Sequence, residues 1–363
     1  MKNKKNQVQK NTKNDIVDKL TEKKLKNKRF KELSKLHKSE SGRIRIEMCC
    51  DFVETKANKD LTVEKVVNCN CCKDRFCPIC SGFKARKEAY AVLVMMNYIK
   101  NLHSKEFIFL TLTAPNVKAD GLEDEIKDFN LSFQRLTKLK GISAVNKGYV
   151  RKTEVTYNKD LKITQELYFK QKDYFDIRNL KIGDDNPNYN TYHVHFHVII
   201  AVNKSYFTDK TYIKQSDWLK YWQDSKRDSN ITQVDVKRIK DSDDTSYLEI
   251  AKYSAKDIDY LINQEVFDVF YKALKGKRLL VYNGLFKKAM TLFKEYKKIK
   301  DKSEKEKHIL HQFIEIDTTE YIYMILYRWG YGKYIEQEKR TLIGEEKKKL
   351  NSVMIDEIEV DST

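Results

Sequence analysis

Residues 191–202 read Thr-Tyr-His-Val-His-Phe-His-Val-Ile-Ile-Ala-Val and contain three of the seven histidines in the chain. Side chains on a β-strand point alternately to its two faces. One face of a strand here would carry His193, His195 and His197, while the apolar side chains of Phe196, Val198 and Ile200 point toward a core. The pattern therefore predicts a strand with imidazoles on one side.

Two other stretches read as strands of the same sheet. Phe107–Thr113 is a β-branched and aromatic run stopped by a turn, and residues 148–158 form another, separated from residues 191–202 by the turn signal Gly183–Asn188. Antiparallel pairing of neighbours is the simplest arrangement. Helical patterns lie at residues 83–102, 122–140, 214–226, 246–263 and 284–300, and the chain after Val202 reads as mainly helical. The fold class is α+β with a mostly antiparallel sheet.

The histidine strand is a candidate metal site. Imidazoles two residues apart on a rigid strand can hold a divalent cation and leave positions open for substrate oxygens. Glu154, on the preceding strand, is a candidate third ligand that would suit Mg²⁺ or Mn²⁺. The alternatives are a solvated strand face rich in histidine and a surface glutamate.

A candidate nucleophile lies on the helical pattern from Leu248 to Ile262, which contains no glycine or proline. At about 100° per residue, Glu249, Tyr253 and Lys256 share one polar stripe. Tyrosine can attack phosphorus if a nearby cation, such as Lys252, Lys256 or the metal, stabilises the phenolate, and a glutamate one turn away can activate water. The alternative is that Tyr253, one of 22 tyrosines, is a packing or surface residue.

All seven cysteines lie between Cys49 and Cys80 in a chain without an export signal, so reduced thiols that bind a metal are favoured over disulfides. Cys77–Cys80 is a CxxC pair that, with Cys72 and either Cys49 or Cys50, could complete a tetrahedral zinc site. A thiol cluster without metal is the alternative. Nearby basic side chains that could contact DNA phosphates are Arg75, Lys84, Arg86 and Lys87.

Charge points to a polyanionic partner. The chain has 71 Lys and Arg against 53 Asp and Glu, a formal net charge of +18, which fits nucleic acid or an anionic membrane surface. No apolar run approaches the roughly 18 residues of a membrane span, so we expect a soluble, cytoplasmic protein.

Several of these motifs resemble those of the initiator proteins that start rolling-circle replication of small Gram-positive plasmids, which belong to the HUH endonucleases. The matching segments are Phe109–Thr113, Tyr192–Ile200, Glu249–Tyr253 and the cysteine segment Cys72–Cys80. The resemblance implies a ferredoxin-like or RRM-like antiparallel sheet with the histidines on a central strand. It also implies His195 and His197 as metal ligands, Tyr253 as nucleophile, Glu249 as the residue that activates water, and zinc ligands at Cys49, Cys72, Cys77 and Cys80.

This resemblance implies a nickase that forms a 5′-phosphotyrosine link and leaves a 3′-OH primer. Its partners would be single-stranded or hairpin plasmid origin DNA, a host helicase and a DNA polymerase. We expect a basic arm, flexible or intermittently helical, over residues 1–43, a zinc-ribbon-like module over 44–90 and the nickase core over 91–265. A helical extension over 266–350 and an acidic, flexible tail over 351–363 would follow. The alternatives are a zinc-dependent DNA-binding regulator without catalysis and another HUH enzyme, a relaxase or transposase.

Overall fold

The computed structural model describes residues 15–240, 259–314 and 319–351, and the chain divides into two compact units. Unit 1 comprises Met1–Lys87 and Ile314–Thr363, and unit 2 comprises Glu88–Phe313. Each unit has its own antiparallel sheet, so the α+β prediction is confirmed. No described helix could serve as a membrane span.

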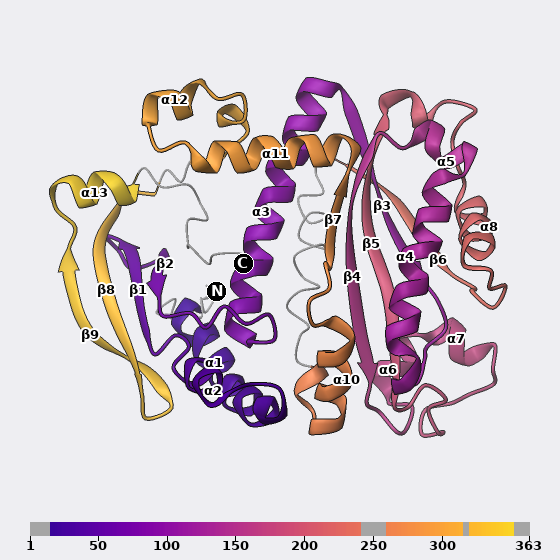
Figure 1. Ribbon diagram of the computed structural model, residues 1–363, viewed down its shortest axis with the longest axis horizontal. Coiled ribbons are helices and arrows are strands. Elements are labelled where there is room, and N and C mark those ends of the chain that lie inside the picture. The colour runs from indigo at the N-terminus through magenta and orange to yellow at the C-terminus, as the bar shows by residue number, and fades with distance from the viewer. Residues whose placement is uncertain (1–14, 241–258, 315–318, 352–363) are drawn as a thin grey trace, which may run out of the picture. The chain divides into compact units, whose positions relative to one another are not determined.

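Unit 2 is built on a five-stranded sheet in the order β6-β3-β5-β4-β7, in which every neighbouring pair is antiparallel (Figure 1). The strands are β3 (Lys105–Thr113), β4 (Gly148–Asn158), β5 (Thr191–Asn203), β6 (Val234–Ile239) and β7 (Leu280–Asn283). The three predicted strands are confirmed, and the histidine strand β5 is the central one. The sequence did not predict β6 and β7, which are short edge strands with mostly partly exposed side chains.

One face of this sheet is covered by α4 (Leu122–Lys138), which in turn packs against α8 (Gln215–Lys226) (Figure 1). Phe129 and Phe133 of α4 meet Phe196 of β5 edge to face, with ring centroids 5.1 and 5.8 Å apart. The apolar side of β5 therefore lies in the core, as predicted, and alternation turns His195 and His197 to the opposite face.

The remaining described helices of unit 2 are mostly short. The predicted helix at residues 83–102 is α3 (Pro78–His103), which the division between the units interrupts, and that at 284–300 is α11 (Gly284–Lys298). The others are α5 (Lys140–Val145), α6 (Gln165–Lys170), α7 (Lys172–Asp176), α10 (Gln264–Leu274) and α12 (Lys302–Lys307). Most of the helix expected at 246–263 lies outside the described residues, and Asp259–Leu261 is a short 3-10 turn.

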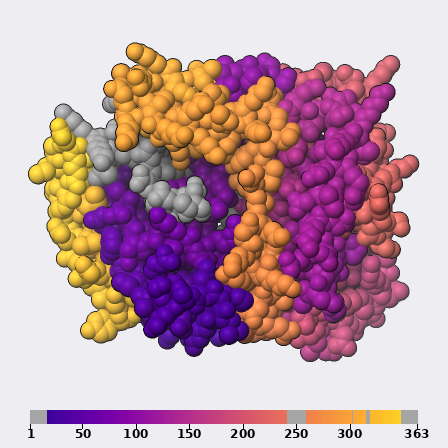
Figure 2. Space-filling view, viewed as in Figure 1, coloured from indigo at the N-terminus to yellow at the C-terminus, as the bar shows by residue number. Residues whose placement is uncertain are grey.

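Unit 1 contains a four-stranded sheet in the order β2-β1-β8-β9. Its strands are β1 (Phe52–Asn58), β2 (Glu64–Cys69), β8 (Tyr321–Gly330) and β9 (Lys333–Thr341), and its helices are α1 (Asp15–Leu33), α2 (Glu40–Glu47), the start of α3, and α13 (Gly344–Asn351). In Figure 2, α1 and α2 form the indigo surface and the β8–β9 hairpin the yellow one.

The secondary structure of the described residues differs from that expected in two segments of the chain. The arm over residues 1–43 was expected to be flexible or intermittently helical, and its residues from Asp15 onward form the regular helix α1 and begin α2. α1 is stabilised by a buried face with helical spacing that includes Val17, Leu20 and Phe30. The extension over 266–350 was expected to be helical, but it contains β7, β8 and β9. β8 finds its partner β1 about 270 residues earlier, a pairing that local sequence cannot reveal.

Candidate metal centres and the nucleophile segment

The registers of β3, β4 and β5 bring the histidine motif together with side chains from both neighbouring strands. His195 lies opposite Glu154 of β4, and His197 lies opposite Thr111 of β3. All three strands are interior to the sheet, so backbone hydrogen bonds on both sides hold them in position. The sequence named Glu154, His193, His195 and His197 as candidate ligands, and the structure brings Glu154, His195 and His197 together.

Glu154 lies between the two imidazoles. Its Oε2 atom is 2.7 Å from Nε2 of His195 and 3.1 Å from Nε2 of His197. All three side chains are buried, and their ligand atoms lie within 4.8 Å of one another, close enough to hold one metal ion. Two nitrogens and a carboxylate make a three-ligand set of the kind that leaves positions open for substrate.

Charge in this group is arranged for a cation. Burial raises the pKa of the Glu154 carboxyl, but the hydrogen bonds from His195 and His197 outweigh it and hold the pKa at about 2. The carboxylate is therefore ionised at neutral pH. Its second oxygen, Oε1, is buried and has no hydrogen-bond partner among the described residues. A buried, ionised oxygen without a donor fits a cation at this position.

His197 is oriented by two residues of β3. Oγ1 of Thr111 lies 3.4 Å from its Nδ1 atom, and the ring of Phe109 stacks on its imidazole at a centroid distance of 5.6 Å. Contacts to the second ring nitrogen commonly fix the direction in which a metal-binding histidine points. Sequence analysis assigned no role to Thr111, although this residue lies in the Phe109–Thr113 segment.

His193 is separate from this group. Its ring centroid lies 5.2 Å from that of His195, but its side chain is not among the three whose ligand atoms converge. Burial, together with the neighbouring His195, lowers the pKa of His193 to about 4. The neutral ring therefore lines the site rather than completing the three-ligand set.

Tyr253, Glu249 and Lys256 all lie outside the described residues. The described chain resumes at Asp259, whose Oδ2 accepts a hydrogen bond from the backbone N–H of Tyr157 on β4 at 3.5 Å. The described chain therefore resumes beside β4, the strand that carries Glu154.

A second candidate centre lies in unit 1, where the sulfur atoms of Cys49, Cys72, Cys77 and Cys80 lie within 4.8 Å of one another. The Cys49 sulfur is 3.6 Å from those of both Cys77 and Cys80, and the Cys72 sulfur is 3.7 Å from that of Cys80. Four sulfurs about 2.3 Å from one tetrahedral zinc ion would be about 3.8 Å apart. The four cysteines singled out by resemblance thus have the spacing that zinc requires.

Electrostatics favour a thiolate in this group. Contact with the thiol of Cys50, and then with those of Cys77 and Cys80, lowers the pKa of Cys49 to about 5 despite burial and the opposing effect of Cys72. The backbone N–H of Cys72 also points at the Cys49 sulfur, at 3.3 Å. These contacts therefore favour the thiolate form of Cys49.

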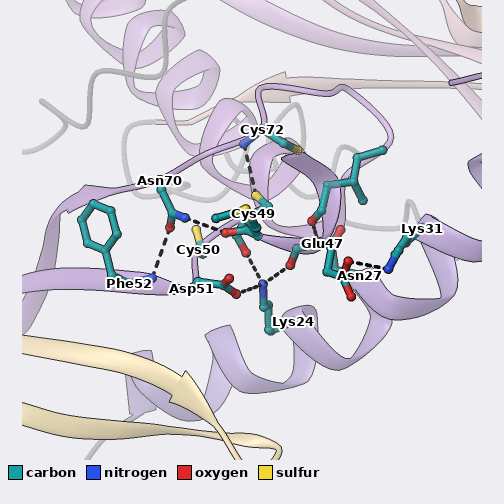
Figure 3. A network of polar contacts seen from close by, with 12 residues as sticks. Lys24, Asn27, Lys31, Glu47, Cys49, Cys50, Asp51, Phe52, Asn70 and Cys72 are labelled. Carbon is teal, nitrogen blue, oxygen red and sulfur yellow. Dashed lines mark hydrogen bonds and ion pairs between the residues drawn. The ribbon is translucent and has the colours of Figure 1, made fainter. Parts of the chain in front are cut away.

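The segment that carries Cys49 is held by a buried lysine, which Figure 3 shows among its polar contacts. Lys24 Nζ donates to the carbonyl oxygens of Glu47 and Cys49, each at 2.6 Å, and pairs with Asp51 at 2.7 Å. Asn27, one turn further along α1, accepts a hydrogen bond from the Cys77 thiol at 3.3 Å. Sequence reasoning missed both residues, although their helical spacing from Leu20 was a usable signal.

The remaining cysteines and the predicted DNA-binding side chains also lie in unit 1. The structure pairs Cys69 with Cys71 in a disulfide, which the expectation of reduced thiols did not include, and Cys50 lies beside this pair. Lys84 and Arg86 are exposed on α3, whereas Arg75 and Lys87 are partly exposed. Contact with DNA by these four stays a prediction.

Comparison with known proteins gives a consistent set of relatives. A family model described as a replication protein matches residues 63–335. A Protein rep of Staphylococcus aureus is 47% identical over 249 residues, 68% of this chain and 96% of that protein. The Protein rep of Bacillus amyloliquefaciens and that of Streptococcus pneumoniae serotype 2 are each 28% identical over 67% of this chain. The matched regions make up 70% and 69% of those two proteins, respectively. No solved structure matches the chain.

Proposed function

The chain belongs to the replication protein family, and on that premise we propose that it initiates plasmid replication by nicking one strand of origin DNA, with Tyr253 as the nucleophile. The observation that carries this proposal is the convergence of Glu154, His195 and His197 from adjacent interior strands. A regulator that only binds DNA has no need of a buried, three-ligand cation site. An HUH-type core is part of the same proposal.

Glu154, His195 and His197 would hold Mg²⁺ or Mn²⁺, because a carboxylate with two imidazoles suits these cations. A bound cation supplies positive charge next to the scissile phosphate. Thr111 and Phe109 fix the orientation of His197, and His193 presents a neutral ring beside the site. These residues would thus position the phosphate through the bound cation, and the ionised Glu154 gives the site the negative charge that binds the cation.

In the proposed step, the phenolic oxygen of Tyr253 forms a bond to phosphorus while the bond from phosphorus to the sugar 3′-oxygen breaks. The phenol gives up its proton to solvent or a nearby base, and the departing 3′-oxygen takes up a proton to become a 3′-OH. The products are a 5′-phosphotyrosine link and a primer end for a polymerase. Lys256 favours the phenolate of Tyr253, and Glu249 activates the water that later releases the strand.

The short stretch of chain between Tyr253 and Asp259 supports this role for Tyr253. Asp259 contacts Tyr157 on β4, three residues from Glu154. Six residues of extended chain span at most about 20 Å. Tyr253 is therefore tethered within reach of the phosphate that the Glu154 site would hold.

Unit 1 contributes binding and stability in this proposal. Its four-thiol site fits zinc, which binds thiolates and stabilises the folded state of small cysteine-rich modules. Lys84 and Arg86 of α3 offer positive charge to the DNA backbone, in line with the net charge of +18. The substrate is single-stranded or hairpin origin DNA, and a host helicase and DNA polymerase extend the primer in the cytoplasm.

The test compares the wild-type chain with Tyr253→Phe on labelled single-stranded origin DNA in the presence of Mn²⁺. We expect a protein–DNA adduct that survives denaturation in the wild type and is absent in Tyr253→Phe. The matched control is Tyr331→Phe, at a fully exposed tyrosine in the β8–β9 turn, which should form the adduct normally. Binding by all three proteins without any adduct would favour the zinc-dependent regulator.

A further inference from the structure

Three cysteines are left over by the four-thiol site, yet they also converge. The sulfur atoms of Cys50, Cys69 and Cys71 lie within 4.8 Å of one another. The sulfurs of Cys50 and Cys71 are 3.7 Å apart, the spacing of about 3.8 Å expected for two thiolates on one tetrahedral zinc ion. A disulfide between Cys69 and Cys71 accounts for two of these sulfurs but not for the approach of the third.

The backbone of Cys50 is held in an unusual conformation that points its side chain into this group. Its φ angle is 58°, in the left-handed region that residues with a Cβ rarely adopt. Its N–H donates to the carbonyl oxygen of Asn70 at 2.9 Å, and its own carbonyl oxygen accepts from the hydroxyl of Tyr334 at 2.8 Å. Residues that their surroundings hold in a rarely populated backbone conformation cluster at functional sites.

The two groups of sulfurs meet at neighbouring residues. Cys49, in the first group, and Cys50, in the second, are consecutive residues of the chain. Two separate tetrahedral ions need eight sulfur ligands, but ions that share one thiolate need seven. The chain has seven cysteines, and all of them lie in these two groups.

We propose that, in the protein with all cysteines reduced, Cys50, Cys69 and Cys71 bind a second zinc-like cation, which shares the Cys49 thiolate with the first. On binding, the seven thiols release their protons to solvent, and seven thiolates with two divalent cations carry a net charge of −3. The buried ammonium of Lys24, held at the Cys49 carbonyl, opposes this negative charge (Figure 3). A Cys69–Cys71 disulfide and the second ion exclude each other, because a disulfide sulfur is not a thiolate.

The first test counts metal. The full chain, purified with a reductant, carries His195→Ala and His197→Ala so that the site in unit 2 does not contribute ions. We expect two zinc ions per chain by elemental mass spectrometry, falling to one when Cys69→Ser and Cys71→Ser are added. One ion per chain before that addition, or a protein mass that shows the Cys69–Cys71 disulfide in the metal-loaded chain, would overturn the proposal.

The second test needs no change in any cysteine, so it stands even if the serine variants do not fold. The same background protein is loaded with ¹¹³Cd, and its cadmium NMR spectrum is recorded. A shared Cys49 sulfur predicts two resonances that are split by coupling to each other. A single resonance, or two without mutual coupling, would rule out a second ion bound through Cys49.

Discussion

The cysteine site of unit 1 and the glutamate–histidine site of unit 2 place their ligands by different means. Cys49 and Cys72 lie in connections, Cys77 directly precedes α3 and Cys80 lies in its first turn, so none of the four is positioned by the register of a strand. Glu154, His195 and His197 lie on interior strands whose register is set by the sheet. The first site should depend on its cation for structure, and the second should be formed before its cation arrives.

Coordination chemistry separates the sites in the same way. Four thiolates fill a tetrahedral zinc ion and leave no position for substrate, whereas a carboxylate with two imidazoles leaves positions open. The two donor sets therefore differ in kind: four sulfurs suit a structural cation, and a carboxylate with two imidazoles suits a cation that also contacts substrate.

The largest expected effect is that of metal removal on unit 1. Structural zinc in small cysteine modules contributes roughly 10–16 kcal/mol of folding free energy. We expect a strong chelator to abolish hydrogen-exchange protection in α2, β1 and β2, while β3, β4 and β5 stay protected. Hydrogen-exchange mass spectrometry of the full chain measures both regions at once. Equal loss of protection in the two sheets would break the comparison.

The next effect concerns chemistry in unit 2. His197→Ala should lower the rate of Mn²⁺-dependent nicking about a thousandfold, equivalent to about 4 kcal/mol, because it removes a ligand of the cation. The thermal unfolding of unit 1 should not change. His103→Ala, at the end of α3, is the matched histidine control. Nicking at near wild-type rate by His197→Ala would remove this site from the mechanism.

A smaller effect is expected from the side chain that orients His197. Thr111→Val keeps the shape of β3 but deletes the hydroxyl that lies 3.4 Å from Nδ1 of His197. Loss of such an outer contact costs about 10–100-fold in metal affinity or activity, and this long contact should lie near tenfold. Thr113→Val is the control, because its hydroxyl bonds to the carbonyl of Gln233 instead. Similar losses in both variants would point to a general effect on β3.

The smallest effect concerns the stability of the sheet of unit 1, measured through the pH dependence of a buried tyrosine, Tyr327. Burial, with Glu64 nearby, raises the pKa of Tyr327 above its usual value near 10. The unfolded chain therefore loses this proton first, so stability is fully present below about pH 10 and falls as the pH rises further, by at most about 1.4 kcal/mol per pH unit. Tyr327→Phe should reduce that slope in urea unfolding between pH 9 and 11. Tyr331→Phe, the exposed control, should not.

Much of the sheet of unit 2 was predictable because its signals are local. Alternation in residues 191–202 predicted β5 and the face of each histidine, and the run from Phe107 to Thr113 predicted β3. In unit 1 the residues 321–330 are just as rich in aromatic and β-branched side chains, but the sequence reading treated them as part of a helical extension. A two-residue turn at Tyr331 and Gly332, both with positive φ, closes the hairpin and was the missed signal.

The sequence by itself determined the chemical types present: imidazoles on one face of a strand, a carboxylate on another, and seven thiols within 32 residues. Only the tertiary structure decided which of them meet. The register of β4 on β5 set Glu154 between His195 and His197, and α1 brought Lys24 and Asn27 to the cysteines. These contacts join residues 20 to 50 positions apart, and they depend on strand register and helix packing. Neither property is encoded in any single stretch of the chain.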